Sequence, residues 1–231
     1  MGADPSPFSV NWLVLRINRK YVAEAAGRYA RGRLLDVGCG ERPYAAELGA
    51  HAEVCVGLEF DQKRYAGMRP EVWGSGLALP FGDGSFDTVF SSQVLEHVPE
   101  PAQMVAEIGR VLGPGGHLIL SAPHIWGVHE EPDDYFRFTG YGLAHLARRA
   151  GLEPLCARPM AGYWVTAGAR FCHYLQQFEK VGLALVTRPL YALVQLTALF
   201  LDRLHRVESD AWNFLLVARK PELVEEGRVA E

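Results

Sequence analysis

The stretch LLDVGCGERPYAAEL, residues 34–48, decides the fold of this 231-residue chain. Its first residues form an apolar strand pattern, after which Gly38 and Gly40 let the backbone turn sharply and bring its N–H groups close to a ligand. A helix predicted after Arg42 would point its N-terminal N–H groups at the same place, which favours an anion or a hydrogen-bonding cofactor tail. The alternative is a tight strand-to-helix turn that binds nothing, and the rest of the chain has to decide between the two.

The composition is that of an ordinary globular protein with one sizeable core, because 49% of the residues are hydrophobic and 22% are charged. A net charge of −4 and a pI near 6.1 argue against nucleic acid as a partner, since duplex binders carry a concentrated basic face. The four cysteines show no CxxC spacing, so that neither a metal site nor a disulfide framework is predicted. Together with the lack of a secretory signal pattern, this predicts a cytoplasmic location.

Strand patterns and helical patterns alternate along the chain, which is typical of an α/β fold with a doubly wound, mostly parallel sheet. The predicted strands are 33–37, 53–60, 86–91, 117–122, 152–157 and 212–219. The predicted helices are an amphipathic leading helix at 8–30, and 44–48, 101–112 and 141–150. Sheets of this kind bind ligands at the carboxyl ends of their strands.

A helical insertion is predicted at 161–210, before a last strand at 211–220. It contains VGLALVTRPLYALVQLTALFL, residues 181–201, which is long enough to raise the question of a membrane. Arg188, Pro189 and Gln195 argue against a simple span, and the proline is expected to divide the run into two shorter apolar helices. The sequence leaves open a buried or dimer-forming helical hairpin and a helix pair in peripheral contact with a membrane.

Further features follow the glycine turn in a fixed order. Glu59, in VGLEFD, lies at the carboxyl end of the second strand, where a carboxylate can accept hydrogen bonds from both hydroxyls of a ribose. Next come LALPFGDGSFDTVFSSQVLEHV, residues 77–98, and PGGHLILSAP, residues 114–123. The second of these starts a strand from a Pro-Gly-Gly turn.

In motif, order and spacing this chain resembles the class I S-adenosylmethionine-dependent methyltransferases, and more narrowly those of type 11. The resemblance implies a seven-stranded Rossmann-like sheet, S-adenosyl-L-methionine as the cofactor, and a single methyltransferase domain over 1–231 with its cofactor-binding core at 33–160. It also implies that the glycine turn faces the methionine portion and that Glu59 binds the ribose. The residues predicted to bind the cofactor are Asp36, Gly38, Cys39, Gly40, Glu59, Phe60, Ser75, Leu77 and Gln93. Ser75 departs from the pattern, since relatives carry an aspartate there for the adenine amino group, and a serine hydrogen bond is weaker.

The segment HEEPDDYFRFTGYGL, residues 129–143, is a polar, aromatic-rich loop at the carboxyl edge of the predicted sheet. It resembles a segment found in methyltransferases that modify glycans or lipids, so that a small-molecule, lipid or glycan acceptor is expected. His124, Tyr135 and Arg137 are predicted to bind the acceptor, unless Arg137 merely pairs with Asp133 or Glu131.

The predicted base for a hydroxyl acceptor is His97 or His129, and the alternative for His97 is a capping or packing role.

Two other functional classes remain open. The glycine turn with Glu59 could belong to an NAD-dependent oxidoreductase, but the third glycine of that fingerprint is missing, since Pro43 follows Glu41 and Arg42. The second is a cofactor-binding module that does not catalyse and serves as a membrane-attached or dimeric partner. Ser75 and the unassigned base motivate this second alternative.

Overall fold

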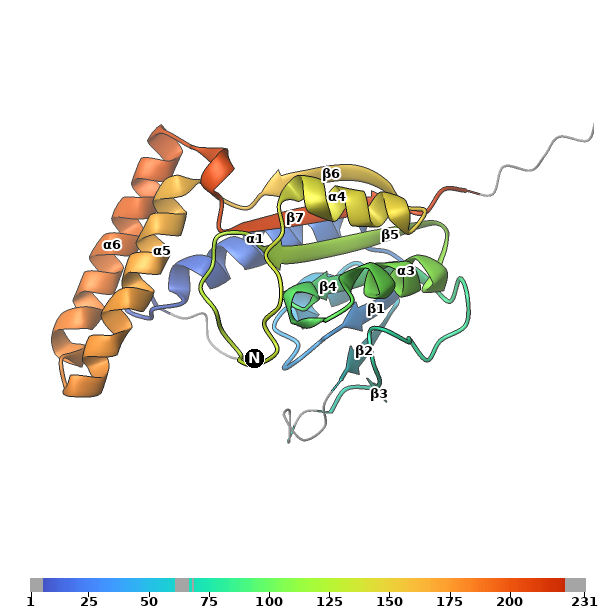
Figure 1. Cartoon of the computed structure of the whole chain (residues 1–231), viewed down its shortest axis with the longest axis horizontal. Coiled ribbons are helices and arrows are strands. Elements are labelled where there is room, and N and C mark those ends of the chain that lie inside the picture. Colours follow the sequence, from blue (N-terminus) through green and yellow to red (C-terminus); the bar gives the residue numbers. More distant parts are fainter. Residues whose placement is uncertain (1–5, 61–66, 68, 223–231) are drawn as a thin grey trace, which may run out of the picture.

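The computed structural model describes residues 6–60, 67 and 69–222. Its centre is a seven-stranded sheet in the order β3-β2-β1-β4-β5-β7-β6 (Figure 1). The strands are β1 (Arg33–Val37), β2 (Val54–Glu59), β3 (Val72–Trp73), β4 (Phe86–Ser92), β5 (Leu112–Pro123), β6 (Glu153–Pro159) and β7 (Asn213–Arg219). Only β7 pairs antiparallel to its neighbours, β5 and β6, among the described strands. The predicted α/β doubly wound sheet of seven strands is therefore confirmed.

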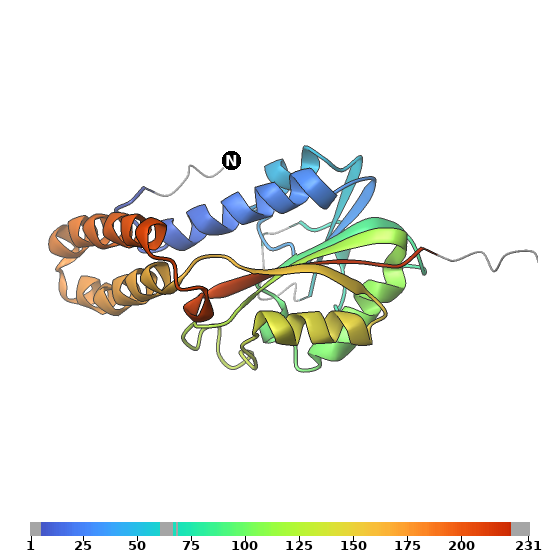
Figure 2. The ribbon, with the colours of Figure 1, turned by 90° about the horizontal axis from the view of Figure 1, so that it is seen from above.

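Helices cover both faces of this sheet (Figure 2). One face packs against α3 (Pro101–Val111) and α4 (Gly140–Arg149), and its core includes Leu118 and Met104. The other face packs against α1 (Trp12–Tyr29) and the short α2 (Ala45–Gly49), and its core includes Phe90 and Ile119. The central strands are apolar on both faces because neither face meets water. Because helices cover the two faces, the edge of the sheet formed by the carboxyl ends of the strands is where a ligand can reach it.

Beyond β6 the chain forms a helical hairpin that extends from this edge (Figure 1). It consists of α5 (Tyr163–Gln176), the 3-10 turn η2 (Gln177–Val181) and α6 (Ala184–Leu204), and a second short turn, η3 (Glu208–Asp210), leads into β7. By length and composition alone, α6 could cross a membrane. The prediction that Pro189 divides this region into two helices is wrong. The proline lies in the second turn of α6, and the carbonyl that it leaves unpaired belongs to Leu185, which is 91% exposed and open to water.

A single buried amide fixes α6 to the start of the chain. The side-chain oxygen of Gln195 accepts the backbone N–H of Leu13 at 2.9 Å. Its side-chain nitrogen donates to the carbonyls of Pro7 at 2.9 Å and Ser9 at 3.0 Å. Because Gln195 is fully buried, these bonds satisfy polar groups that water cannot reach, and they hold α1 against the middle of α6.

Candidate active site

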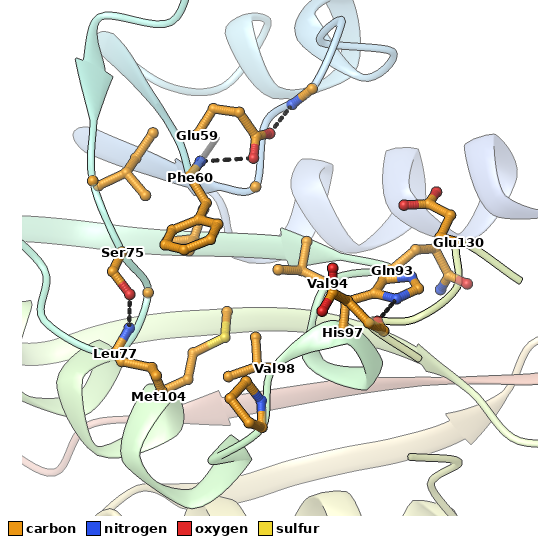
Figure 3. Close-up of a pocket in the computed structure, with 18 of the residues that line it drawn as sticks. Glu59, Phe60, Ser75, Leu77, Gln93, Val94, His97, Val98, Met104 and Glu130 are labelled. Atoms are coloured by element: carbon orange, nitrogen blue, oxygen red, sulfur yellow. Dashed lines mark hydrogen bonds between the residues drawn. The ribbon is translucent and has the colours of Figure 1, made fainter. Parts of the chain in front are cut away.

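A cavity of about 390 Å³ opens at the carboxyl ends of β1, β2 and β4. Most residues predicted to bind the cofactor line it, as Figure 3 shows in part. Those that do are Gly38, Gly40, Glu59, Phe60, Ser75, Leu77 and Gln93. The same cavity also reaches His97 and Tyr135, so that it joins the predicted cofactor side to the predicted acceptor side.

The glycine turn is closed over the end of β2 by backbone hydrogen bonds. Gly38 and Gly40 both have positive φ angles, 73° and 48°, which a side chain would strain. A Cβ at Gly38 would also collide with the side chain of Val94. The N–H of Gly38 donates to the carbonyl of Leu58 at 2.8 Å. Position 38 therefore needs glycine for two independent reasons, its positive φ and the lack of space for a Cβ.

Glu59 lies buried at the end of β2 and faces this turn. Its Oε2 accepts the N–H of Gly40 at 2.9 Å, and its Oε1 accepts the N–H of Phe60 at 2.8 Å (Figure 3). Each carboxylate oxygen keeps a further lone pair that can accept from a ligand hydroxyl. The ring of Phe60, which is 72% exposed, stands beside the carboxylate at the cavity wall. This arrangement can bind the two hydroxyls of a ribose.

An apolar slot lies across the cavity from Glu59. Figure 3 shows Leu77, Val98 and Met104 together beside Ser75. The hydroxyl of Ser75 accepts the N–H of Leu77 at 3.1 Å and keeps its own proton for donation. A flat ring system of the size of a purine fits such a slot, with one polar contact at its rim.

Two residues that were predicted to bind the cofactor, Asp36 and Cys39, are not among those that line the cavity. Asp36 is buried in β1, and burial raises its pKa to about 7, although nearby Arg42 lowers it and Glu59 raises it further. Cys39 is buried in the turn, and burial raises the pKa of its thiol to about 11. A thiol with so high a pKa is not a nucleophile at neutral pH, which agrees with a packing role.

His97 lines the cavity. It belongs to the 3-10 turn η1 (Leu95–His97) that follows β4. Its Nδ1 lies 2.6 Å from the carbonyl oxygen of Asp133, so that this nitrogen carries the proton and donates. Nε2 then keeps its lone pair, as a neutral general base requires.

The neighbouring Glu96 is fully buried, and neither of its carboxylate oxygens has a hydrogen-bond partner among the described residues. Burial raises its pKa to about 8, although Arg137 lowers it while Asp134 and Glu130 raise it. Oε1 lies 3.8 Å from Nε2 of His97. One donor atom each from Glu96, His97 and His129 lie within 4.8 Å of one another, a grouping that could hold a metal ion and that the sequence did not predict.

Strain marks the joint between β4 and η1. Gln93, a non-glycine residue, has a φ of 58° and lines the cavity. Its backbone N–H donates to the carbonyl of Ser121 at 3.0 Å, which holds this conformation. Residues kept in sparsely populated backbone regions cluster at functional sites.

The loop between β5 and α4 is folded back onto η1. The N–H groups of Tyr135 and Phe136 donate to the carbonyl of Glu96 at 2.9 and 3.3 Å. Inside the loop, the guanidinium of Arg137 donates two hydrogen bonds to the carboxylate of Asp134, at 2.6 Å to Oδ1 and 2.7 Å to Oδ2. It also donates to the carbonyl of Gly127. This hydrogen-bonded pair lowers the pKa of Asp134 and raises that of Arg137. The partner of Arg137 is therefore Asp134, and the pair shapes the loop.

The predicted acceptor-side residues divide accordingly. His97 and Tyr135 line the cavity, whereas His129, His124 and Arg137 are not among its lining residues. His129 packs edge-on against His97, with 4.9 Å between ring centroids, and His124 packs against Phe214. Further lining residues, which were not predicted from the sequence, include Val94, Val98, Met104 and Asp133. Met104 could have been found, because it lies on the apolar inner face of an amphipathic helix.

Comparison with known proteins agrees with this geometry. Residues 35–120 match the model of a methyltransferase domain family. An uncharacterised methyltransferase of Mycobacterium marinum is 38% identical over 140 residues, which are 55% of this chain and 54% of that protein. The 27-O-demethylrifamycin SV methyltransferase of Amycolatopsis mediterranei is 30% identical over 173 residues, 62% of this chain and 63% of that protein. The chain thus spans about half to two thirds of the length of these relatives.

Among solved structures, the cyclase SpnF is similar, with a TM-score of 0.60, 26% identity, and coverage of 90% of this chain and 81% of that chain. S-adenosylmethionine, the cofactor predicted from the sequence, is typical of proteins with this domain and this strand order. The glycine turn, the acid at the end of β2 and the matched family model agree, and residues 35–120 carry the methyltransferase domain of the class I S-adenosylmethionine-dependent methyltransferases.

Proposed function

We propose that this protein transfers a methyl group from S-adenosylmethionine to the hydroxyl of a small-molecule, lipid or glycan acceptor. The observation that carries the proposal is the shared cavity, because Glu59 and His97 line the same space. When bound, the cofactor would supply an electrophilic methyl group attached to a sulfonium sulfur. Transfer of the methyl group breaks the sulfur–carbon bond and leaves the neutral thioether. The relative named for a 27-O-demethylated substrate supports an oxygen acceptor of small-molecule type.

The residues around the cavity have separate tasks in this reaction. Glu59 and the apolar slot beside Ser75 hold the nucleoside, and the glycine turn lets the methionine portion approach the backbone. Tyr135 and the carbonyl-bound His97 face the acceptor side. As the acceptor oxygen bonds to the methyl carbon, Nε2 of His97 takes the hydroxyl proton. Alignment and exclusion of water provide much of the rate enhancement in such displacements.

The test begins with calorimetric titration of S-adenosylmethionine and of its demethylated product into the purified protein. Micromolar binding of both is expected, whereas no binding at millimolar cofactor would refute the proposal. Release of the demethylated product is then measured with lipid, glycan and small-molecule extracts as acceptors. Binding without turnover on any acceptor would favour the non-catalytic module, and binding of NAD in place of the cofactor would favour the oxidoreductase.

His97 is tested with His97→Gln, with exposed His145→Gln on α4 as the matched control. We expect the first to lower kcat by about 10²- to 10⁴-fold with little change in cofactor affinity, as for loss of a general base. The control should leave both quantities unchanged. An unchanged kcat in His97→Gln would show that the acceptor needs no base at this position.

A further inference from the structure

A stripe of large apolar side chains runs along the outer face of α6. Its members are each more than half exposed, and they recur every three to eight residues on one side of the helix. They are Leu185, Leu193, Leu196, Phe200 and Leu204, and we call them the apolar stripe. No charged residue occurs between Arg188 and Asp202. Only 28% of the most apolar part of this helix is buried in the protein, so that the stripe is not core.

A large basic cavity lies between α6 and the first half of α1. Its volume is about 740 Å³. Its cationic lining residues are Arg16, Arg19, Lys20, Arg203 and Arg206, and we call it the basic cavity. Its one acidic lining residue is Asp202, which accepts the N–H of Gly162 at 3.1 Å. The cavity therefore carries a clear excess of positive charge.

Two of these cations are not neutralised by the protein. Arg19 pairs with Glu47 at 3.0 Å, and Arg206 pairs with Glu208 at 3.3 Å. Arg16 lies over the ring of Trp12, and neither it nor Arg203 forms a salt bridge with any described residue. An anion of the size of a phosphate would find two available guanidinium groups here, which bind phosphate oxygens in bidentate fashion.

The apolar stripe and the basic cavity adjoin each other. Arg203 follows Phe200 of the stripe by three residues and Leu199 of the cavity wall by four, and residues at these spacings are neighbours on a helix surface. Arg16 of α1 and Arg203 of α6 line the same cavity, so that the two helices meet there. The two features thus form one continuous surface, apolar in the middle and cationic along one flank.

The opposite face of α6 is fixed to the protein by the buried Gln195 and its hydrogen bonds to Leu13, Pro7 and Ser9. Crossing a bilayer would break these bonds, whereas lying in the plane of a membrane surface would keep them. Interfacial helices of this kind expose a large apolar face and carry Lys or Arg beside it.

We propose that the apolar stripe and the basic cavity dock the protein on a bilayer containing anionic phospholipid. The stripe enters the boundary between headgroups and acyl chains, and the basic cavity binds a headgroup phosphate. Charge complementarity favours this occupant over a second copy of the chain, because a lipid phosphate supplies the anion that Arg16 and Arg203 lack. An apolar face of a second copy would supply none.

The experiment is flotation of the full chain with phosphatidylcholine vesicles, with and without about 30 mol % phosphatidylglycerol. Binding is expected only to the anionic vesicles, and it should weaken when NaCl rises from about 0.1 M to about 0.5 M. The double variant Leu193→Ser with Phe200→Ser should bind at least about tenfold more weakly. Arg16→Gln with Arg203→Gln should bind about twenty-five-fold more weakly, at roughly fivefold for each arginine.

Matched controls are available on α4, on another part of the molecule. Tyr141 is 91% exposed there, and Arg148 and Arg149 are exposed. Tyr141→Ser, and Arg148→Gln with Arg149→Gln, should bind vesicles as the natural chain does. Thermal unfolding and cofactor titration of every variant show whether it is folded, and they separate failure of docking from failure of the proposed activity.

Four outcomes would overturn the proposal. The first is that the folded natural chain does not float with anionic vesicles. The second is that the stripe and cavity variants float as well as the controls. The third is that soluble glycerol 3-phosphate binds in calorimetry and abolishes flotation, with the stripe variant unaffected, which would make the cavity a site for a free phosphate. The fourth is that the natural chain is a dimer by light scattering and the stripe variant a monomer that floats normally.

Discussion

The backbone N–H of Gly40 donates to Oε2 of Glu59 at 2.9 Å, which ties the turn after β1 to the acid that ends β2. The two positions are 19 residues apart in the sequence, and parallel pairing of β1 with β2 brings them together. The same carboxylate therefore shapes the glycine turn and is available to a ribose.

Replacing Glu59 by Ala should weaken S-adenosylmethionine binding by at least about tenfold, because hydrogen bonds to a charged acceptor contribute roughly 1.5–3 kcal/mol. Calorimetry measures the loss. Glu59→Gln is the matched control for shape, since it keeps one oxygen acceptor while removing the charge, and it should fall between the natural chain and Glu59→Ala. Equal affinity in all three proteins would mean that the ribose binds elsewhere.

The turn is tested by Gly38→Ala, alone and combined with Val94→Ala. Gly38→Ala should destabilise the fold and weaken cofactor binding, both because of its positive φ and because the new Cβ meets Val94. The second substitution makes room but does not change φ, so that only part of the loss should be recovered. A double-mutant cycle of chemical denaturation measures the coupling. Additive effects of the two substitutions would argue against the collision.

The buried carboxyl of Glu96 makes stability depend on pH. Its pKa is about 8 in the folded protein against an ordinary value of 4.5, so that between these values the folded state binds a proton that the unfolded state does not. The resulting stabilisation is complete below about pH 4.5 and is lost as pH rises through about 8.

Glu96→Gln removes this titration while keeping the shape of the side chain. The free energy of unfolding of the natural chain should fall relative to that of Glu96→Gln by up to about 1.4 kcal/mol per pH unit between about pH 5 and pH 8. Urea denaturation at several pH values measures the difference. Parallel pH profiles of the two proteins would contradict burial of an unpaired carboxyl.

Chelation tests the donor grouping of Glu96, His97 and His129. With His97 acting as a base through a free Nε2, treatment with EDTA should leave turnover unchanged within about twofold, since a general base needs no metal. Loss of activity that added Zn²⁺ or Mg²⁺ restores would instead assign the three residues to a metal.

The contact between α1 and α6 depends on one side chain. Gln195→Leu would leave the buried N–H of Leu13 and the carbonyl of Pro7 without this partner, while the carbonyl of Ser9 keeps the N–H of Trp12, and it should destabilise the protein by about 1–3 kcal/mol for each group that stays unsatisfied. Thr197→Ala, exposed on the same helix, should change stability by less than about 0.5 kcal/mol. Thermal unfolding compares the two, and similar losses would contradict the role of Gln195.

Much of the fold could be predicted because its signals are local. The strands β1, β2 and β4 show apolar runs next to glycine turns, and their predicted ranges end within one residue of the observed ones, whereas β5 begins five residues earlier than predicted. The two-residue β3 was missed, since a strand that short has no periodicity to detect. Pro189 was misjudged because its effect depends on where the helix begins, at Ala184, and that start is set by the packing of the hairpin.

The candidate site was predictable only where one motif supplies both the residue and its place. Gly38 and Glu59 belong to such motifs, and both line the cavity. The hydrogen bond from His97 to Asp133 spans 36 residues, and it is this loop contact that leaves Nε2 available. No sequence spacing encodes it. The partner of Arg137 was missed by one residue, because Asp133 and Asp134 offer the same charge and only the loop geometry distinguishes them.

Trp126, in the loop that carries Tyr135, packs edge-on against His173 of α5, with 4.9 Å between ring centroids, and also contacts Trp212. The loop at the reaction cavity and the hairpin therefore share one small aromatic core. If this core couples the two sites, the coupling free energy is the same in both directions, from the hairpin to the reaction cavity and from the cavity to the hairpin. Suppose that a vesicle bound at the hairpin raises the affinity for an acceptor. The bound acceptor must then raise the affinity for the vesicle by the same factor. A protein of this design would hold its acceptor most tightly where the acceptor and the lipid surface occur together.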